Sequence, residues 1–159
     1  MNSEQEITIK TIRFGDLQVH TDRLITMPNG ILGFPECKRY VMLDHDEESP
    51  FKWLQCADDP DLAFVVTDPL VFFHDYRIDV KPEELGVLEL KNAQDAAILV
   101  ILSLVGGPRN MTANLQGPII INSVNRVGKQ VVLKEGKYNT RHGLFPDLNA
   151  EAVDDPAEK

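Results

Sequence analysis

Cysteine and long apolar runs are both scarce in this sequence. Its 159 residues include two cysteines, Cys37 and Cys56, which are too few and too far apart for a disulfide framework or a zinc site. We therefore expect two small, half-buried thiols. No apolar run approaches the roughly 20 residues that span a bilayer, and residues 1–10 lack the continuous apolar core of a signal peptide. These absences predict a cytoplasmic protein that does not enter a membrane.

Positive charge is also in short supply. The chain has 16 Lys and Arg against 25 Asp and Glu, a net charge of −9. This balance argues against direct nucleic-acid binding, because phosphate contacts require clustered positive charge. The charges are unevenly spread: residues 44–61 contain seven acids and one base, whereas residues 126–141 contain five bases and one acid. Two solvated faces are the simpler interpretation. The alternative is an acidic surface suited to a basic protein partner.

Catalytic and metal-binding motifs are missing from the sequence. The four histidines have no metal-ligand spacing, and there is neither a glycine-rich phosphate loop nor a nucleophile elbow. The one local candidate is the carboxylate cluster of Asp58, Asp59 and Asp61, which could offer oxygen ligands to a hard cation. Pro60 and the lack of a calcium-loop pattern favour a turn in which Asp side chains cap backbone N–H groups. We expect no cofactor.

Short β-branched and aromatic runs, separated by Gly, Pro, Asn and Asp, dominate the chain. The pattern predicts ten strands, at residues 7–11, 17–19, 23–27, 40–43, 51–55, 62–67, 96–105, 111–115, 119–122 and 130–133. One short helix is expected near residues 82–86, where Pro and two acids precede Gly, and a helix is the alternative for residues 93–99. The predicted fold class is all-β: a compact antiparallel, barrel-like domain with one short helix, or a sandwich.

Two further expectations concern the core and the C-terminus. The alternation of the strands that flank the acidic turn predicts that Trp53 and Phe64 contribute to one core. From residue 145 onward the chain is acidic and nearly without apolar residues, so it cannot offset the entropy cost of ordering. We therefore expect a folded domain over residues 1–144 and an acidic, disordered tail over residues 145–159.

Residues 111–118 mix strand-forming residues with side-chain amides. On a strand, Asn114 and Gln116 share one face, and Ala113 and Leu115 share the other. A half-buried strand is the structural interpretation. The functional alternative is a polar face or sheet edge that accepts a segment of a partner.

Several segments, taken together, resemble the FliW family of flagellar assembly factors. They are residues 28–34 (PNGILGF), 51–64 (FKWLQCADDPDLAF), 111–119 (MTANLQGPI), 128–130 (GKQ) and 138–142 (YNTRH). Their order and spacing make the set specific, and it covers roughly residues 5–144. Position 56 departs from the family pattern, in which we expect Ser rather than Cys.

This resemblance implies a compact β-barrel-like fold, no enzymatic activity and two protein partners. One implied partner is flagellin, held in the cytoplasm before export. The other is the RNA-binding translational repressor CsrA, which is sequestered once flagellin has been secreted. The implied function is therefore a non-catalytic binding switch that couples flagellin translation to export.

We predict partner-binding residues in two groups. The acidic group consists of Gln55, Asp58, Asp59 and Asp61, and the polar group consists of Thr112, Asn114, Gln116 and Asn122. Two alternative functions stay open. One is an oligonucleotide-binding barrel that uses the basic residues of 126–141. The other is a metal-dependent enzyme that uses the carboxylates of residues 58–61.

Overall fold

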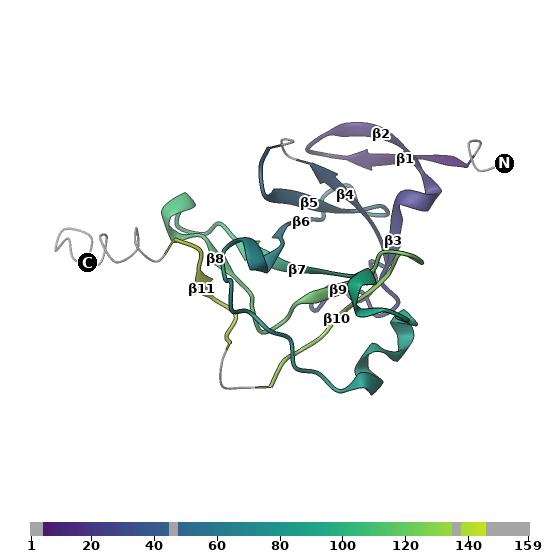
Figure 1. The fold of residues 1–159 in the computed structure, drawn as a ribbon. Coiled ribbons are helices and arrows are strands. Elements are labelled where there is room, and N and C mark those ends of the chain that lie inside the picture. Colours follow the sequence, from purple (N-terminus) through teal and green to yellow (C-terminus); the bar gives the residue numbers. More distant parts are fainter. Residues whose placement is uncertain (1–4, 45–47, 135–137, 146–159) are drawn as a thin grey trace.

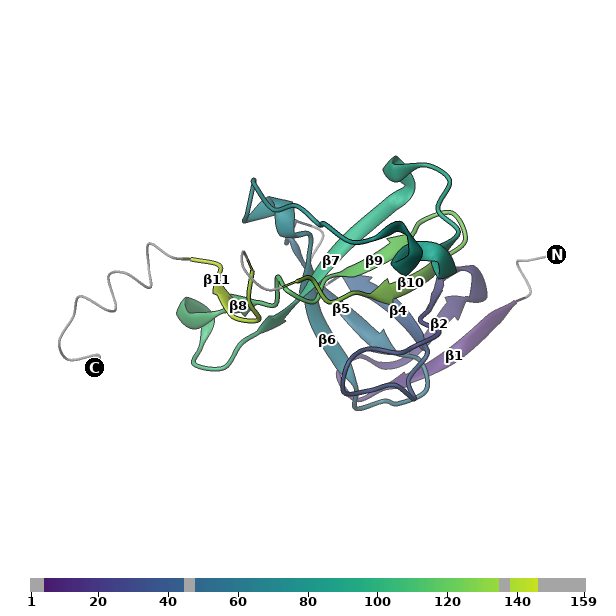
Figure 2. The same ribbon diagram turned by 90° about the horizontal axis from the view of Figure 1, so that it is seen from below.

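Seven strands close into a barrel in the computed structural model, which describes residues 5–44, 48–134 and 138–145. The barrel strands are β3 (Leu24–Thr26), β4 (Arg39–Asp44), β5 (Phe51–Cys56), β6 (Ala63–Thr67), β7 (Ala96–Ser103), β9 (Ile119–Asn122) and β10 (Val127–Gln130). They pair in the order β3-β4-β5-β6-β7-β9-β10, and β10 returns to β3 to close the ring (Figures 1 and 2). The predicted all-β, barrel-like fold is confirmed.

One contact of the ring departs from the antiparallel pattern. Strands β3 and β10 pair in parallel, with Thr26 opposite Val127, whereas the other barrel contacts are antiparallel. The parallel contact joins segments about a hundred residues apart, and the backbone N–H of Thr26 donates to the carbonyl of Arg126 at 2.9 Å. Closure of this kind leaves the barrel with fewer unpaired edges.

Among the described residues, four strands lie outside the ring. A hairpin of β1 (Glu6–Thr11) and β2 (Gly15–His20) packs on the outer side of β4, where Ile9, Val19 and Val41 form a small apolar cluster (Figure 1). Strands β8 (Thr112–Ala113) and β11 (His142–Gly143) extend the far end of β7.

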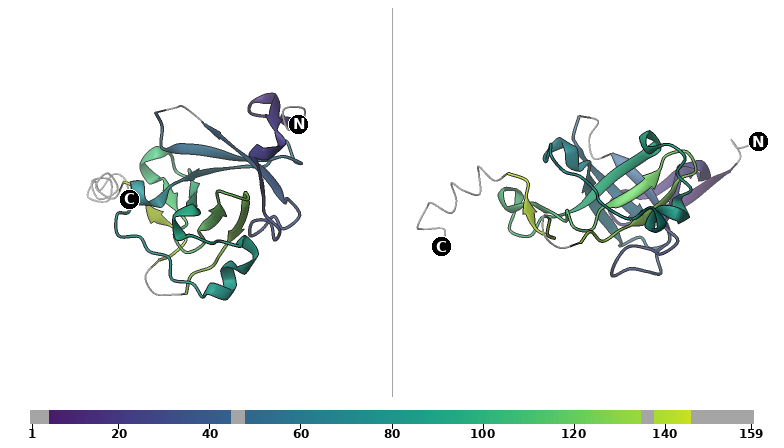
Figure 3. Two further views of the ribbon diagram at one scale, coloured as in Figure 1. Left: turned by 45° about the vertical axis from the view of Figure 1, so that its right-hand side comes forward. Right: turned by 60° about the horizontal axis from the view of Figure 1, so that its bottom comes forward.

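The helical pieces among the described residues are short 3₁₀ helices. They are η2 (Thr21–Arg23), η3 (Pro69–Val71), η4 (Pro82–Leu88), η5 (Ala93–Asp95) and η6 (Pro108–Asn110). The helix expected near residues 82–86 is η4, which lies against β10 (Figure 3). It ends at Glu89, whose φ of 55° breaks the helical path. The helix considered for residues 93–99 is limited to η5, since β7 begins at Ala96.

The barrel interior and a second apolar cluster form the core. The interior is filled by side chains that include Ile25, Tyr40, Leu54 and Val66. The second cluster joins the other face of β7 to the segment that follows β6, through Leu88, Val100 and Leu102 among others. Residues 146–159, most of the predicted tail, lie outside the described residues.

The expectation that Trp53 and Phe64 share one core is wrong. Phe64 lies opposite Leu54 across the β5–β6 ladder and packs in the barrel interior. Trp53 alternates to the outer face of β5, where the guanidinium of Arg13 lies 4.5 Å from the centre of the indole ring and the ring of Phe14 is 6.0 Å away. Cross-strand partners share a face, and Trp53 is opposite Val65 rather than Phe64.

Candidate partner-binding surface

The acidic turn, residues 57–62, connects β5 to β6 and is held from beneath by Gln55. This side chain is fully buried. Its amide nitrogen donates to the carbonyl oxygens of Cys56 and Asp59, each at 3.1 Å, with those of Leu62 and Pro60 at 3.2 and 3.4 Å. Gln55 therefore positions the turn and offers a partner no surface of its own.

Asp58 is engaged in an ion pair with Arg39 at the start of β4. Nη2 and Nε of Arg39 donate to the two carboxylate oxygens of Asp58 at 2.5 and 3.2 Å. This hydrogen bonding lowers the pKa of Asp58 and raises the pKa of Arg39. Both side chains are about half exposed, so solvent screens the pair and its contribution to stability is modest.

Asp59 and Asp61 supply the unpaired charge of the turn. Asp59 Oδ1 accepts the backbone N–H of Asp61 at 3.0 Å, an Asx turn of the kind predicted for these residues. Both residues are exposed, and neither forms an ion pair with any residue that the structure describes. Within the same residues, no group of three or more His, Cys, Asp or Glu side chains could hold a metal ion.

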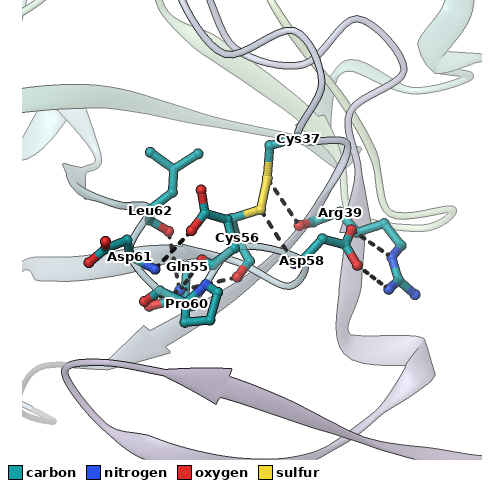
Figure 4. The surroundings of a disulfide bond; sticks show 9 residues. Cys37, Arg39, Gln55, Cys56, Asp58, Pro60, Asp61 and Leu62 are labelled. Atoms are coloured by element: carbon teal, nitrogen blue, oxygen red, sulfur yellow. Dashed lines mark hydrogen bonds and ion pairs between the residues drawn. A yellow bond between two sulfur atoms is a disulfide. The ribbon is translucent and has the colours of Figure 1, made fainter.

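The two cysteines form a disulfide bond, so the prediction of two separate thiols is wrong (Figure 4). The β4–β5 register places Tyr40 opposite Cys56. The chain just before β4 therefore passes close to Cys56, and the Cα atoms of Cys37 and Cys56 are 6.4 Å apart. Sequence spacing alone does not reveal this register, which is set by pairing between strands.

An exposed apolar loop, residues 28–36, lies beside the acidic turn. Leu32 and Phe34 are 63% and 43% exposed, and the Phe34 ring packs edge-on against Phe64 at 5.4 Å. Gly30 permits the tight path, since its φ is +66° and a Cβ there would lie 2.6 Å from the carbonyl oxygen of Phe34. The backbone N–H of Leu32 donates to Gln130 Oε1 at 2.8 Å. Apolar and acidic groups thus meet on one surface.

The polar group has a different local structure from the one predicted. Strand β8 stops at Ala113, and Asn114 Oδ1 accepts the backbone N–H groups of Gln116 and Gly117 at 3.1 and 2.9 Å. Asn114 and Gln116 therefore lie in a turn and do not share a strand face. Thr112 pairs with β7 on one side and β11 on the other, so β8 is not a free sheet edge.

Asn122 is buried and has a structural role. Its Nδ2 donates to the carbonyl of Leu88 at 2.8 Å, and its Oδ1 accepts the backbone N–H of Val124 at 2.9 Å. These bonds tie the end of β9 to the end of η4. The structure does not place Asn122 among exposed polar residues, and the polar group is therefore reduced to Thr112, Asn114 and Gln116.

A free backbone edge, which the sequence did not reveal, borders a groove of about 770 Å³. One wall is the extended segment 77–81, and the other is residues 132–134, which follow β10. The backbone groups of residues 78–80 and of Val132 form no hydrogen bond with any described residue. We predicted a strand at 130–133. β10 ends at Gln130, and beyond it the N–H groups of Val131 and Leu133 donate to the carbonyls of Pro118 and Gln116 at 2.9 and 2.8 Å. We refer to this feature as the edge groove.

Comparison with known proteins places the chain in a family. A sequence profile described as FliW protein matches residues 8–144. The chain belongs to the FliW family. The flagellar assembly factor FliW of Natranaerobius thermophilus is 40% identical over 145 residues, covering 91% of this chain and 96% of the relative. The corresponding factor of Treponema denticola is 39% identical over 142 residues, covering 89% and 96%.

A solved FliW structure supports the same assignment. The crystal structure of a flagellar assembly factor FliW superposes with a TM-score of 0.81 at 40% identity, covering 88% of this chain and 98% of that chain. The FliW match ends at residue 144, and the next residue, Phe145, still packs edge-on against Phe72 at 5.8 Å. No helix that the structure describes in this FliW chain is long and apolar enough to cross a membrane.

Proposed function

We propose that this protein acts in flagellum assembly as a non-catalytic, cytoplasmic binding switch. In this function it binds flagellin before export and sequesters the translational repressor CsrA when flagellin is depleted. The family assignment supports a role in assembly, since the relatives are named flagellar assembly factors. The structural observation that carries the binding role is the surface formed by the acidic turn and the apolar loop, which share the Cys37–Cys56 connection.

The acidic turn (residues 57–62) and the apolar loop (residues 28–36), together called the composite surface, fit a basic partner. Asp59 and Asp61 project unpaired carboxylates from a turn that the buried Gln55 holds in place. Such charges raise the association rate of a basic protein and help to select it. Leu32 and Phe34 add exposed apolar area beside them, and the buried centre of an interface is more apolar than its rim. We therefore assign CsrA to this surface.

We assign flagellin to the edge groove and the adjoining polar turn. Gln116 Nε2 donates to the carbonyl of Leu133, a residue of the groove wall, at 3.3 Å, so the two features are continuous. An extended segment laid in the groove can pair with the free backbone groups of Val132 and residues 78–80. The two partners are thus assigned to separate surfaces. One partner would then displace the other either by a change transmitted through the barrel or because the bound partners are large enough to collide.

Titration of a charge variant tests the CsrA assignment. In the double variant Asp59→Asn and Asp61→Asn, the turn chemistry is kept because Asn also caps backbone N–H groups, whereas two negative charges are removed. CsrA affinity should fall, chiefly through the association rate, and its salt dependence should flatten. The matched control is Glu83→Gln with Glu89→Gln, which removes two exposed charges on and beside η4.

Calorimetric titration of the wild-type protein with each partner tests the broader proposal. Saturable binding of purified flagellin and of purified CsrA is the expected result. Failure of the wild-type protein to bind either one would refute the proposed function. Equal losses in the test and control variants would remove the acidic turn from the CsrA surface.

A further inference from the structure

The Cys37–Cys56 disulfide joins the two halves of the composite surface. Cys37 directly follows the apolar loop, and Cys56 ends β5 immediately before the acidic turn. The Sγ of Cys56 accepts the backbone N–H of Asp58 at 3.4 Å, and the Sγ of Cys37 lies 3.9 Å from the carbonyl oxygen of Arg39 (Figure 4). The two sulfur atoms of the disulfide therefore contact the backbone groups of both members of the Arg39–Asp58 ion pair.

The surrounding structure also suits the reduced form of the pair. A Cys37 thiol can donate a hydrogen bond to the carbonyl of Arg39, whereas a disulfide sulfur has no proton to donate there. A Cys56 thiol can still accept the N–H of Asp58. The ends of the loop remain joined without the covalent bond, because Met27 N–H donates to the Lys38 carbonyl at 2.7 Å and Ala57 N–H donates to the Arg39 carbonyl at 2.8 Å.

The part of the structure that depends on the bond is the second half of the apolar loop, residues 32–36. The first half is held by Ile31, which is buried in the barrel interior. Besides turn bonds, the second half is attached to the barrel by the Phe34–Phe64 ring contact and by the hydrogen bond from Leu32 to Gln130. Both contacts involve exposed or half-exposed groups, which water can replace. Reduction would thus release one anchor of the loop and leave the β4–β5 ladder unchanged.

We propose that Cys37 and Cys56 form a reversible thiol–disulfide switch that sets the order of the apolar loop and, through it, the affinity of the composite surface for its basic partner. The effect of the switch on partner affinity rests on the proposed function. Disulfides in reducing compartments are usually transient and redox-sensing rather than structural. A disulfide in a protein to which we assign a cytoplasmic role fits that class.

The exchange reaction is carried by a dithiol reductant. Its thiolate attacks Cys37 Sγ, the more accessible sulfur, because Cys37 is 8% exposed whereas Cys56 is fully buried. The Cys37–Cys56 bond breaks, Cys56 leaves as a thiolate and takes a proton, and a mixed disulfide forms at Cys37. The second thiol of the reductant then displaces Cys37, which also takes a proton. Two electrons and two protons pass to the protein, and the reductant becomes its own disulfide.

The oxidised form should be the better binder. A tethered loop presents Leu32 and Phe34 in a fixed position, so less conformational freedom is lost when the partner binds. We expect CsrA to bind the oxidised form about tenfold more tightly than the reduced form, by this reduction in ordering cost. Flagellin affinity at the edge groove should be the same in both forms.

The test compares the two redox forms of the full chain. An aliquot of each form, prepared with or without dithiothreitol, is denatured and treated with iodoacetamide, and mass spectrometry should find two adducts per reduced chain and none per oxidised chain. Amide hydrogen exchange over residues 32–36 and calorimetric titration with CsrA and flagellin use the untreated protein. Cys56→Ser is the control: it retains an acceptor for Asp58 N–H, and its exchange and binding should match those of the reduced wild type with or without dithiothreitol.

The outcomes separate the switch from the proposed function. Faster loop exchange and weaker CsrA binding in the reduced form would support the switch. Failure to form the disulfide, or equal loop exchange in two forms that alkylation shows to be distinct, would overturn it, as would equal CsrA affinity with binding intact. If neither form binds either partner, the proposed function fails, and the loop exchange still decides whether the bond controls the loop.

Discussion

The side-chain amide of Gln55 lies 3.2 Å from the carbonyl oxygen of Leu62, inside the hairpin of β5 and β6 and without contact with solvent. Four carbonyl oxygens surround this nitrogen, which has two protons to donate. A glutamine fits because the turn brings acceptors, not donors, to this position. The exposed carboxylates above it owe their placement to this buried side chain.

Replacement of Gln55 should therefore disturb the turn. Gln55→Ala should lower the free energy of unfolding by about 1–3 kcal/mol, because buried carbonyl groups lose their donor. Gln55→Glu should cost more at neutral pH, since a carboxylate would face the same carbonyl oxygens, and part of that loss should be recovered in acid as the new side chain is protonated. Urea unfolding of the three proteins at two pH values is the measurement. Equal stability of both variants would contradict the donor role.

The two adjacent residues Trp53 and Leu54 should differ in their importance for stability. Leu54 is fully buried in the barrel interior, and Leu54→Ala should cost about 2–5 kcal/mol. Trp53 is half-buried on the outer face under Arg13 and Phe14, and Trp53→Ala should cost about 1–2 kcal/mol from the loss of ring and cation contacts. Chemical denaturation of both variants tests the order. A larger loss for Trp53 would contradict the observed strand register.

The environment of His142 leads us to expect that the stability of the fold depends on pH. Its Nε2 accepts the backbone N–H of Asn139 at 3.0 Å, and the rings of Phe73 and Tyr138 lie about 6 Å away. Burial lowers the pKa of His142 below its ordinary value of 6.5. The folded state therefore binds fewer protons than the unfolded state, so this contribution to stability is present above the unfolded pKa and is lost as the pH falls through the folded pKa.

The measurement is the free energy of unfolding between about pH 7 and pH 5, the range in which histidine titrates. His142→Gln keeps an acceptor for Asn139 and removes the titration, so its stability should fall less over this range than that of the wild type. Parallel curves for the two proteins would show that His142 is not the group responsible.

Local patterns predicted much of the fold, and pairing between distant segments accounts for the rest. The apolar, β-branched runs at residues 40–43, 51–55 and 119–122 each lie in a strand as expected, because alternation and β-propensity are local properties. The parallel contact of β3 with β10 is not encoded in either segment alone. Neither is the Cys37–Cys56 bond, which depends on the β4–β5 register.

The predicted site was correct in its turn chemistry and less so in its exposed residues. The Asx turn at Asp59 follows from the Asp-Pro-Asp sequence. Amide residues were harder to place: Gln55 and Asn122 are buried donors to backbone carbonyls, and their role depends on loops that fold back over them. No sequence pattern indicated the edge groove, because residues 131–133 have the composition of a strand. Only the three-dimensional structure shows that the backbone of Val132 lacks a partner among the described residues.

Val132 offers a test of the flagellin assignment. Its side chain is 54% exposed, and its backbone N–H and carbonyl have no partner among the residues that the structure describes. A lysine on an exposed strand edge disfavours the addition of another strand, and it would be added to a groove lined by three bases, Arg77, Lys81 and Lys134, and two acids, Asp79 and Glu84. Val132→Lys should therefore weaken flagellin binding by about tenfold, which corresponds to about 1.4 kcal/mol.

The matched control is Val124→Lys, which introduces the same charge at a valine that is 72% exposed on the β9–β10 connection. Both valines are more than half exposed, so both variants should melt within a few degrees of the wild type. Calorimetric titration should show loss of flagellin affinity for Val132→Lys alone, with CsrA affinity unchanged in both. Unchanged flagellin binding by a folded Val132→Lys variant would exclude the edge groove, because a strand paired with Val132 would lie beside the new charge. Loss of CsrA binding instead would mean that the two partners meet on one surface of the barrel.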